Sequence, residues 1–164
     1  MGADIYLQSK FKPHHEVWEP RFHAAVEARN RLYPCGVPEG CPEQAAVNAA
    51  YDQMYSVGYF RDSYNSTSLF WLLDLSWWGS GFVNDKGKMG VRAMKTLLAN
   101  LESQPITDEL MSKWVAKAEG NAVVEPDGPN SVAAWREMFE RKRLKLMGLL
   151  REAIDLKEPL DCSC

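Results

Sequence analysis

Apolar residues at helical spacing recur along most of this chain and constrain its fold more than any other feature. Met94, Leu97, Leu98 and Leu101 follow the i, i+3, i+4, i+7 pattern that places side chains on one face of an α-helix. Other stretches show similar faces, and prolines, glycines and capping residues separate them. The chain is therefore predicted to be mostly α-helical, a compact bundle of about six helices with a short N-terminal β-strand and at most a minor sheet.

Breaking and capping residues set the limits of the predicted helices. The first begins at Pro20 and ends before the proline- and glycine-rich residues 31–41, the second runs from Pro42 to near Gly58, and the third covers residues 66–77. The fourth follows residues 79–90 and ends at Pro105, the fifth is capped by Thr107 and closed by Gly120, and the last runs from Asn130 or Ser131 to Leu156.

A short strand is expected at Asp4-Ile5-Tyr6-Leu7, because residues that favour β-structure dominate there. A strand needs a neighbour to satisfy its backbone. The two candidate partners are residues 81–83 and 122–124.

The length and charge of the chain limit its class. A chain of 164 residues fits a single domain over 1–164. No stretch is apolar for the length of a membrane span, and no signal peptide is visible, so a cytoplasmic protein with no membrane association is expected. A net charge of −3 gives no general attraction to nucleic acid.

The segment from Tyr59 to Trp78 has the composition of a ligand site. Arg61 could clamp a phosphate or carboxylate, and the N-terminus of the predicted third helix could bind an anion through its unpaired N–H groups. Aromatic side chains could stack on a planar ring such as a nucleobase. The predicted ligand-binding residues are Tyr59, Arg61, Tyr64, Asn65, Ser66, Thr67, Trp77 and Trp78.

A structural interpretation of the same segment stays open. Asn65 or Ser66 would then only cap the third helix, Arg61 and Asp62 would form ordinary ion pairs, and the aromatic side chains would belong to the core. Asp74 also has two interpretations. It either faces solvent on a short amphipathic helix or pairs with Arg61 and orients it for a ligand.

No catalytic residue, metal site or cofactor is predicted. Cys35 and Cys41 lie too far apart for a typical zinc pair, so free thiols are expected, although a disulfide between them is geometrically conceivable. The remaining candidate groups are His14, His15 and His23, expected to be exposed near a proline bend, and the basic run at residues 141–145, expected to be a solvated helix face.

Three motifs together resemble an uncharacterised family of small bacterial and bacteriophage proteins. They are Met1-Gly2-Ala3-Asp4-Ile5-Tyr6, the block of residues 59–65, and Leu75-Ser76-Trp77-Trp78, and they cover roughly the first half of the chain. The resemblance implies a prokaryotic or phage setting and carries no activity or catalytic residue. Small phage proteins of this kind often act by binding, as inhibitors of host systems or by sequestering signalling molecules.

Three functions follow as hypotheses. The first is a non-catalytic protein that sequesters or senses a small anionic or nucleotide-like ligand at residues 59–78. The second is a protein–protein inhibitor or adaptor that acts on a host system through an aromatic surface and can form homo-oligomers. The third is an enzyme whose site is not visible in the sequence.

Overall fold

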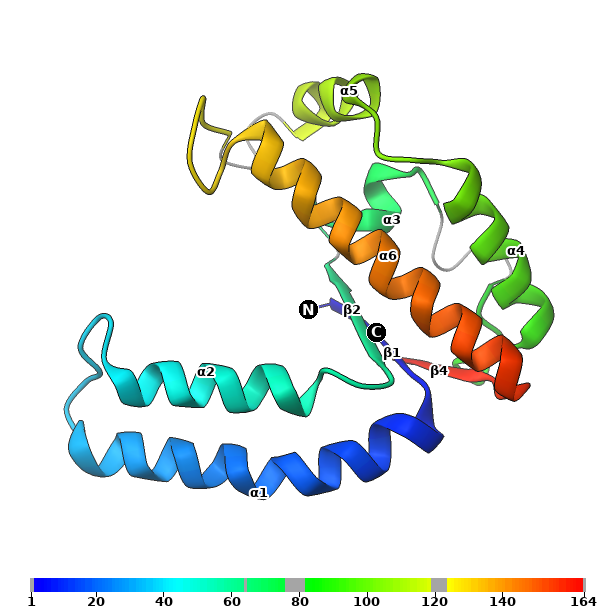
Figure 1. Ribbon diagram of the computed structural model, residues 1–164. Helices are drawn as coiled ribbons and strands as arrows, with labels where there is room; N and C mark the ends of the chain where they lie inside the picture. The colour runs from blue at the N-terminus through cyan, green and yellow to red at the C-terminus, as the bar shows by residue number, and fades with distance from the viewer. Residues whose placement is uncertain (1, 64, 76–81, 119–123, 164) are drawn as a thin grey trace. The chain divides into compact units, whose positions relative to one another are not determined.

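The structure, a computed structural model, describes residues 2–63, 65–75, 82–118 and 124–163, and 61% of these residues are helical (Figure 1). The elements follow one another as β1 (Gly2–Tyr6), α1 (Gln8–Leu32), α2 (Pro42–Met54), β2 (Tyr59–Ser63), α3 (Leu69–Leu72), β3 (Lys88–Met89), α4 (Val91–Ser103), α5 (Asp108–Ala118), α6 (Val132–Leu156) and β4 (Leu160–Ser163). The predicted class, mostly α-helical with about six helices and a minor sheet, is confirmed.

The chain divides into two compact units. The larger unit combines Met1–Tyr6 with Phe60–Cys164, and the smaller unit is Leu7–Tyr59. The single domain expected over residues 1–164 stays a prediction. Within the described ranges, no helix has both the length and the apolar character that crossing a membrane requires.

The sheet has the strand order β2-β1-β4-β3. β1 pairs antiparallel with β4, with Asp4 opposite Ser163 and Tyr6 opposite Asp161, and β4 also pairs with β3. The partners predicted for the first strand, residues 81–83 and 122–124, are wrong, since the two neighbours of β1 in the sheet are β2 and β4. Residues 81, 122 and 123 lie outside the described ranges. The sequence of β4 has no β-branched residue, so its composition gave little sign of a strand.

The core of the larger unit lies between α4 and α6. Met94, Leu97 and Leu101 of α4 are fully buried, and so are Phe139 and Leu150 of α6. α6 begins where expected, because the hydroxyl of its N-cap Ser131 accepts a hydrogen bond from the N–H of Ala134. The predicted limits of α4 and α6 are confirmed to within a residue or two.

α5 also begins as predicted. The hydroxyl of Thr107 accepts a hydrogen bond from the N–H of Leu110, and Trp114 is buried on the inner face. On the outer face the ammonium of Lys113 donates a hydrogen bond to Glu109 and holds the pKa of that carboxyl below its usual range.

The smaller unit is a helical hairpin of α1 and α2. α1 begins at Gln8, so the start predicted at Pro20 is wrong, and the helix continues through both Pro13 and Pro20. Aromatic contacts with the segment after α2 hold the first turns of α1: Phe11 stacks against Tyr55 and Tyr59 with centroid distances of 6.0 and 5.7 Å. This tertiary packing offsets the two hydrogen bonds that the prolines remove.

The two ends of the hairpin are tied by polar contacts. At the loop end, the hydroxyl of Tyr33 donates a hydrogen bond to Glu43, and desolvation and the neighbouring carboxylate raise the pKa of Tyr33. At the other end, the N–H of Leu7 bonds the carbonyl of Gly58. A Cβ at Gly58 would lie 2.6 Å from the backbone nitrogen of Phe11, so only glycine fits this crossing.

The histidines belong to this hairpin, and the expectation that all three are exposed is wrong for two of them. His14 and His15 are half-buried, whereas His23 is exposed. The Nε2 of His14 lies 2.6 Å from the carbonyl oxygen of Gln53, and the ring of His15 packs against Phe11 and Tyr55. The long first helix, which the sequence did not predict, turns these side chains toward α2.

Candidate functional site

The predicted third helix is shorter than expected and starts later. α3 covers Leu69–Leu72, and its N-cap is Ser68, whose hydroxyl accepts a hydrogen bond from the N–H of Trp71. The start predicted at residue 66 is wrong. Asn65 forms a tight turn in front of the helix, with its side-chain oxygen accepting bonds from the N–H and the hydroxyl of Thr67.

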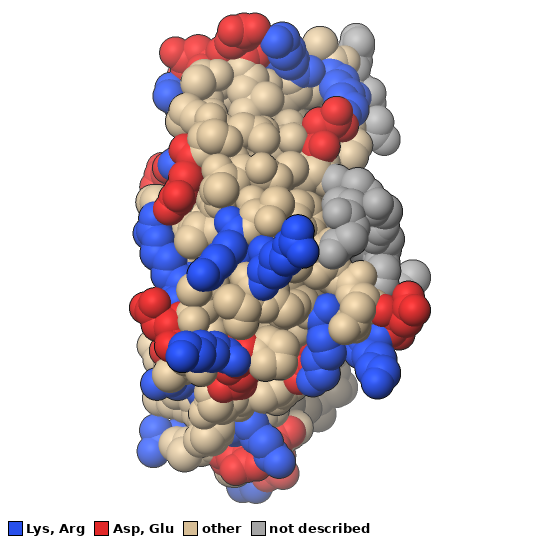
Figure 2. Space-filling model, turned by 90° about the vertical axis from the view of Figure 1, so that its right-hand side faces the viewer, with Lys and Arg blue, Asp and Glu red and all other residues tan. Residues whose placement is uncertain are grey.

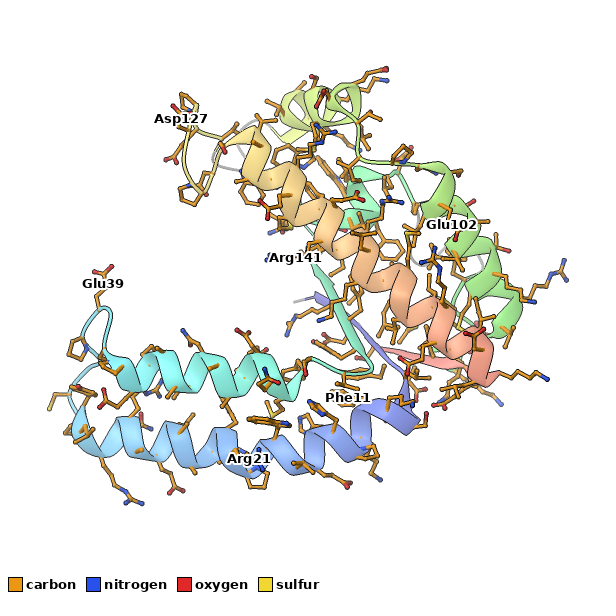
Figure 3. The ribbon with its side chains drawn as sticks, viewed as in Figure 1. Phe11, Arg21, Glu39, Glu102, Asp127 and Arg141 are labelled. Atoms are coloured by element: carbon orange, nitrogen blue, oxygen red, sulfur yellow. The ribbon has the colours of Figure 1, made fainter. Side chains whose placement is uncertain are left out.

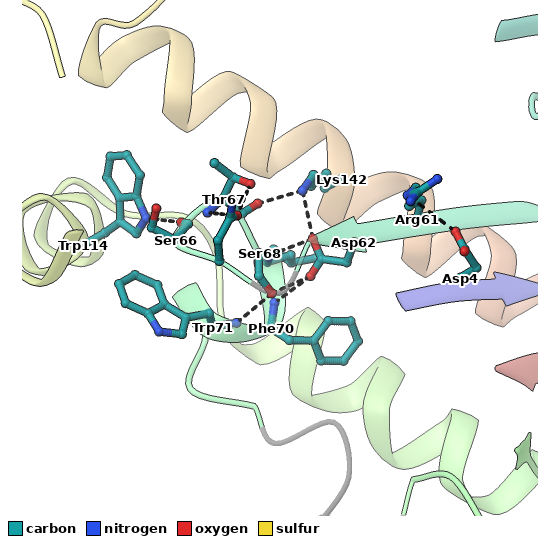
Figure 4. A network of polar contacts seen from close by, with 12 residues as sticks. Asp4, Arg61, Asp62, Ser66, Thr67, Ser68, Phe70, Trp71, Trp114 and Lys142 are labelled. Carbon is teal, nitrogen blue, oxygen red and sulfur yellow. Dashed lines mark hydrogen bonds and ion pairs between the residues drawn. The ribbon is translucent and has the colours of Figure 1, made fainter. Parts of the chain in front are cut away.

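A buried carboxylate occupies the start of α3 (Figure 4). Asp62 of β2 is 1% exposed and accepts hydrogen bonds from the hydroxyl of Ser68 at 2.8 Å and from the N–H groups of Leu69 and Phe70 at 3.1 Å. These N–H groups are among those that a short helix leaves without an intrahelical partner. The chain's own acid therefore lies where an anionic ligand was expected.

Lys142 of α6 completes this cluster. Its ammonium lies 2.8 Å from a carboxylate oxygen of Asp62 and also donates to the carbonyl of Thr67 at 2.7 Å. The indole N–H of the buried Trp114 donates to the carbonyl of Ser66 at 2.7 Å. The segment between β2 and α3 is thus fixed from α5 and from α6, two elements distant in the sequence (Figure 4).

The Asp62–Lys142 cluster has the chemistry of a structural centre. Each carboxylate oxygen of Asp62 accepts two hydrogen bonds, which fills its acceptor capacity. Among the described residues no buried side-chain nitrogen or oxygen is left without a partner. A carboxylate held in this way positions the chain around it.

Arg61 lies on the other side of the strand from Asp62. Its side chain is 52% exposed, and its Nε is 3.7 Å from a carboxylate oxygen of Asp4 on β1 (Figure 4). Asp74 is exposed and follows α3 with a φ of 52°. The solvent-facing interpretation of Asp74 agrees with this position, although the residue lies beyond the helix and not on it.

The structure places the eight predicted ligand-binding residues in different surroundings. Tyr59 is buried in the hairpin unit, and Ser66 is buried in the larger unit. Arg61, Asn65 and Thr67 reach the surface, whereas Tyr64, Trp77 and Trp78 lie outside the described residues. Arg61, Asn65 and Thr67 are therefore the predicted residues with a described, solvent-accessible position.

The residues that organise this segment were not among the predicted site residues. Strand alternation would have pointed to Asp62, because a strand over residues 59–63 puts Phe60 and Asp62 on one face and Arg61 on the other. Lys142 carried no such signal. It stood within a basic run expected to be solvated, and of that run Arg141 and Leu144 are exposed while Lys142 and Arg143 bond to acids.

A second surface of interest lies on the hairpin. Trp18, Arg21, Phe22 and Tyr51 form what we call the hairpin patch. The guanidinium of Arg21 lies 4.6 Å from the ring centre of Trp18, and the rings of Phe22 and Tyr51 are 5.9 Å apart. Tyr51 is 40% exposed, and no residue of α1 is buried. Arg21 is labelled on this helix in Figure 3.

A basic surface lies where α4 begins. A hollow of about 330 Å³ is lined in part by Asn84, Lys88 and Arg92, next to a helix start without a side-chain cap. Figure 2 shows Lys and Arg side chains standing among uncharged surface on the side where α4 lies in Figure 1. Lys88 pairs with Asp161 of β4, so part of this positive charge is already balanced.

The described ranges contain free thiols and no arranged set of metal ligands. There, no group of three or more His, Cys, Asp or Glu side chains is arranged to hold a metal ion. Cys35, Cys41 and Cys162 are free thiols, so the expectation of free thiols is confirmed for these three. The thiol of Cys41 caps α2 by accepting a hydrogen bond from the N–H of Gln44 at 3.4 Å.

Comparison with known proteins adds no family to these observations. No family model matches the chain, and neither the curated proteins nor the solved structures give a significant match. The resemblance to small bacterial and bacteriophage proteins stays a prediction.

Proposed function

We propose that the protein is a non-catalytic binding protein that engages another protein through the hairpin patch. In this proposal it acts in the cytoplasm of a prokaryote, as an inhibitor or adaptor of phage or bacterial origin. The observation that carries the proposal is α1, a helix of 25 residues with no buried residue. Helices of globular proteins normally bury one face, and a long helix gains most of its stability from that burial.

The composition of the patch fits a protein interface. Tryptophan, tyrosine and arginine are the residues that most often dominate the energy of such interfaces. Trp18 and Phe22 are half-buried and Tyr51 is exposed, so their rings rest on the hairpin and still present area to a partner. A partner with an apolar surface and a nearby carboxylate would meet both the rings and Arg21.

Site-specific photocrosslinking in bacterial cells tests this proposal. A benzophenone amino acid replaces Val17, which is 55% exposed and next to the patch, and in the control it replaces the exposed Lys95 of α4. We expect one dominant protein adduct from position 17, and we expect Arg21→Glu combined with Tyr51→Ala to remove it. The same adducts from both positions, or an adduct that survives the double substitution, would contradict the proposal.

Binding of a small anionic or nucleotide-like ligand at residues 59–78 is the second candidate. Its support is that the guanidinium of Arg61 and the polar turn at Asn65 are both exposed. The N–H groups of α3 give it no support, because Asp62 occupies them. A thermal-shift screen of nucleotides and cyclic nucleotides tests it: a specific ligand raises the melting temperature, and Arg61→Ala abolishes that rise.

A further inference from the structure

On one face of α6, the residue types follow the same order whether the helix is read from its N-terminus or from its C-terminus. Along it stand Ala133, then Arg136 and Glu137, then Glu140 and Arg141, then Leu144. The order is an apolar residue, Arg-Glu, Glu-Arg and an apolar residue, and it is symmetric about the point between Met138 and Phe139. We infer that this face, here called the α6 face, binds the α6 face of a second copy of the chain in antiparallel orientation.

The α6 face is open and partly apolar. Leu144 is 55% exposed and Val132 is 39% exposed, and a hollow of about 760 Å³ runs along the face between them. Both residues flank the charged centre rather than forming one apolar block. A partner must therefore bring apolar side chains at the two ends and opposite charges in the middle.

A second copy provides this arrangement by symmetry. In a two-fold interface, residue i contacts residue j of the other copy, and j contacts i. With the axis at the level between Met138 and Phe139, Leu144 comes to the same level as Ala133 of the second copy. Val132 lies beside that contact, so the two apolar ends cover each other.

The charges match under the same operation. At 100° per residue, Arg136 and Glu140 lie on one side of the midline of the face, while Glu137 and Arg141 lie on the other. The two-fold axis brings Arg136 to within one residue, about 1.5 Å along the helix, of the level of Glu140 in the second copy. Glu137 and Arg141 meet in the same way, which gives four ion pairs per dimer.

The side chains have bonding capacity left for these pairs. Glu137 and Arg141 form no ion pair within the part of the chain that the structure describes. Arg136 uses its Nε for the carbonyl of Ile106 and its Nη1 for Asp108. Glu140 accepts one bond from Arg143 at each oxygen, and a carboxylate oxygen can accept two.

Self-association explains the order of residues better than an unrelated partner does. An unrelated protein can complement any arrangement of charges, so it gives no reason for the reversed repeat. A single helix pair lies at the small end of stable interfaces, so a Kd in roughly the micromolar range is expected.

Sedimentation velocity of the full chain over a wide concentration range tests the proposal. The wild type is expected to form dimers as its concentration rises. Glu137→Arg or Arg141→Glu alone creates like-charge contacts at both ends of the interface and should raise the Kd about tenfold. The double variant Glu137→Arg/Arg141→Glu restores opposite charges and should return the Kd to near the wild-type value.

The matched control for Arg141→Glu is Lys95→Glu, which makes the same charge change at an exposed position of α4 and should leave the Kd unchanged. A monomer at every concentration would overturn the proposal. A dimer indifferent to the single reversals, or a double variant no tighter than the singles, would show that any dimer forms elsewhere and would equally overturn it.

Discussion

At the scale of single residues, Asp62 shows how a chain can occupy its own anion site. The segment between β2 and α3 brings two N–H groups, a hydroxyl and an ammonium to one point, a combination that also binds phosphates and carboxylates in ligand sites. Here the anion is part of the chain. The sequence predicted an anion site at the start of the helix in this region but assigned it to an external ligand, with Asp62 considered only as a partner in ordinary ion pairs.

Asp62→Asn should destabilise the fold strongly. It removes the charge that the buried N–H groups and Lys142 share, and breaking a partly buried ion pair costs about 3 kcal/mol. Urea-induced unfolding measures this loss. The control Glu102→Gln removes an acid whose ion pair with Arg151 of α6 is exposed, and it should cost less than about 0.5 kcal/mol. Equal losses in the two variants would contradict a structural role for the Asp62–Lys142 cluster.

At the scale of elements, the sequence predicted helices well where capping and burial agree. α4, α5 and α6 have amphipathic patterns together with Gly90, Thr107 and Ser131 at their N-caps, and local and tertiary preferences coincide. α1 was predicted too short because Pro13 and Pro20 suggest a break. Tertiary packing that the sequence does not reveal favours the continuous helix, with Phe11 on Tyr55 and Tyr59 before Pro13 and Phe22 on Tyr51 after Pro20.

The sheet and α3 were predicted less well for a related reason. β4 pairs with residues at the other end of the chain, and its four residues carry no local pattern strong enough to show this. α3 is a single turn whose position depends on Asp62, so its start could not be read from the capping residues alone.

Pro20→Ala should stabilise the hairpin. It restores an N–H that can bond the carbonyl of Glu16, and it removes a ring that opposes the helix, for a net gain of about 2 kcal/mol after the larger freedom of the unfolded chain is counted. Chemical denaturation gives the change. Pro34→Ala, in the loop after α1, should have the opposite sign and lose about 0.5 kcal/mol. A loss of stability in Pro20→Ala would indicate that α1 depends on the bend at this proline.

At the scale of the whole molecule, the two units differ in how much they bury. α6 contains six buried residues, whereas α1, of the same length, contains none. Buried apolar area sets the free energy of local opening. The hairpin should therefore open more readily than the unit built on α4 and α6.

Native-state hydrogen exchange tests this difference. Amides of α1 and α2 should exchange through a common opening with a lower free energy than the amides of α4 and α6. Uniform protection across both groups would show that the chain opens as one cooperative unit. Fast exchange confined to residues 33–41 would indicate fraying of the loop without opening of the hairpin.

The pairing of β1 with β4 has a consequence for the time course of folding. β1 lies between β2 and β4 in the sheet, and of these two neighbours β4 is the one that exists only after nearly all of the described residues have been synthesised. Closing so long a loop is entropically costly, so this contact is expected to form late, after the local helices. Because Ser163 lies opposite Asp4, a short linker that joins β4 to β1 would turn this slow contact into a local β-hairpin. If new chain ends were then made in the exposed loop of residues 125–130, the permuted chain would be expected to form first the strand contact that the original chain forms last.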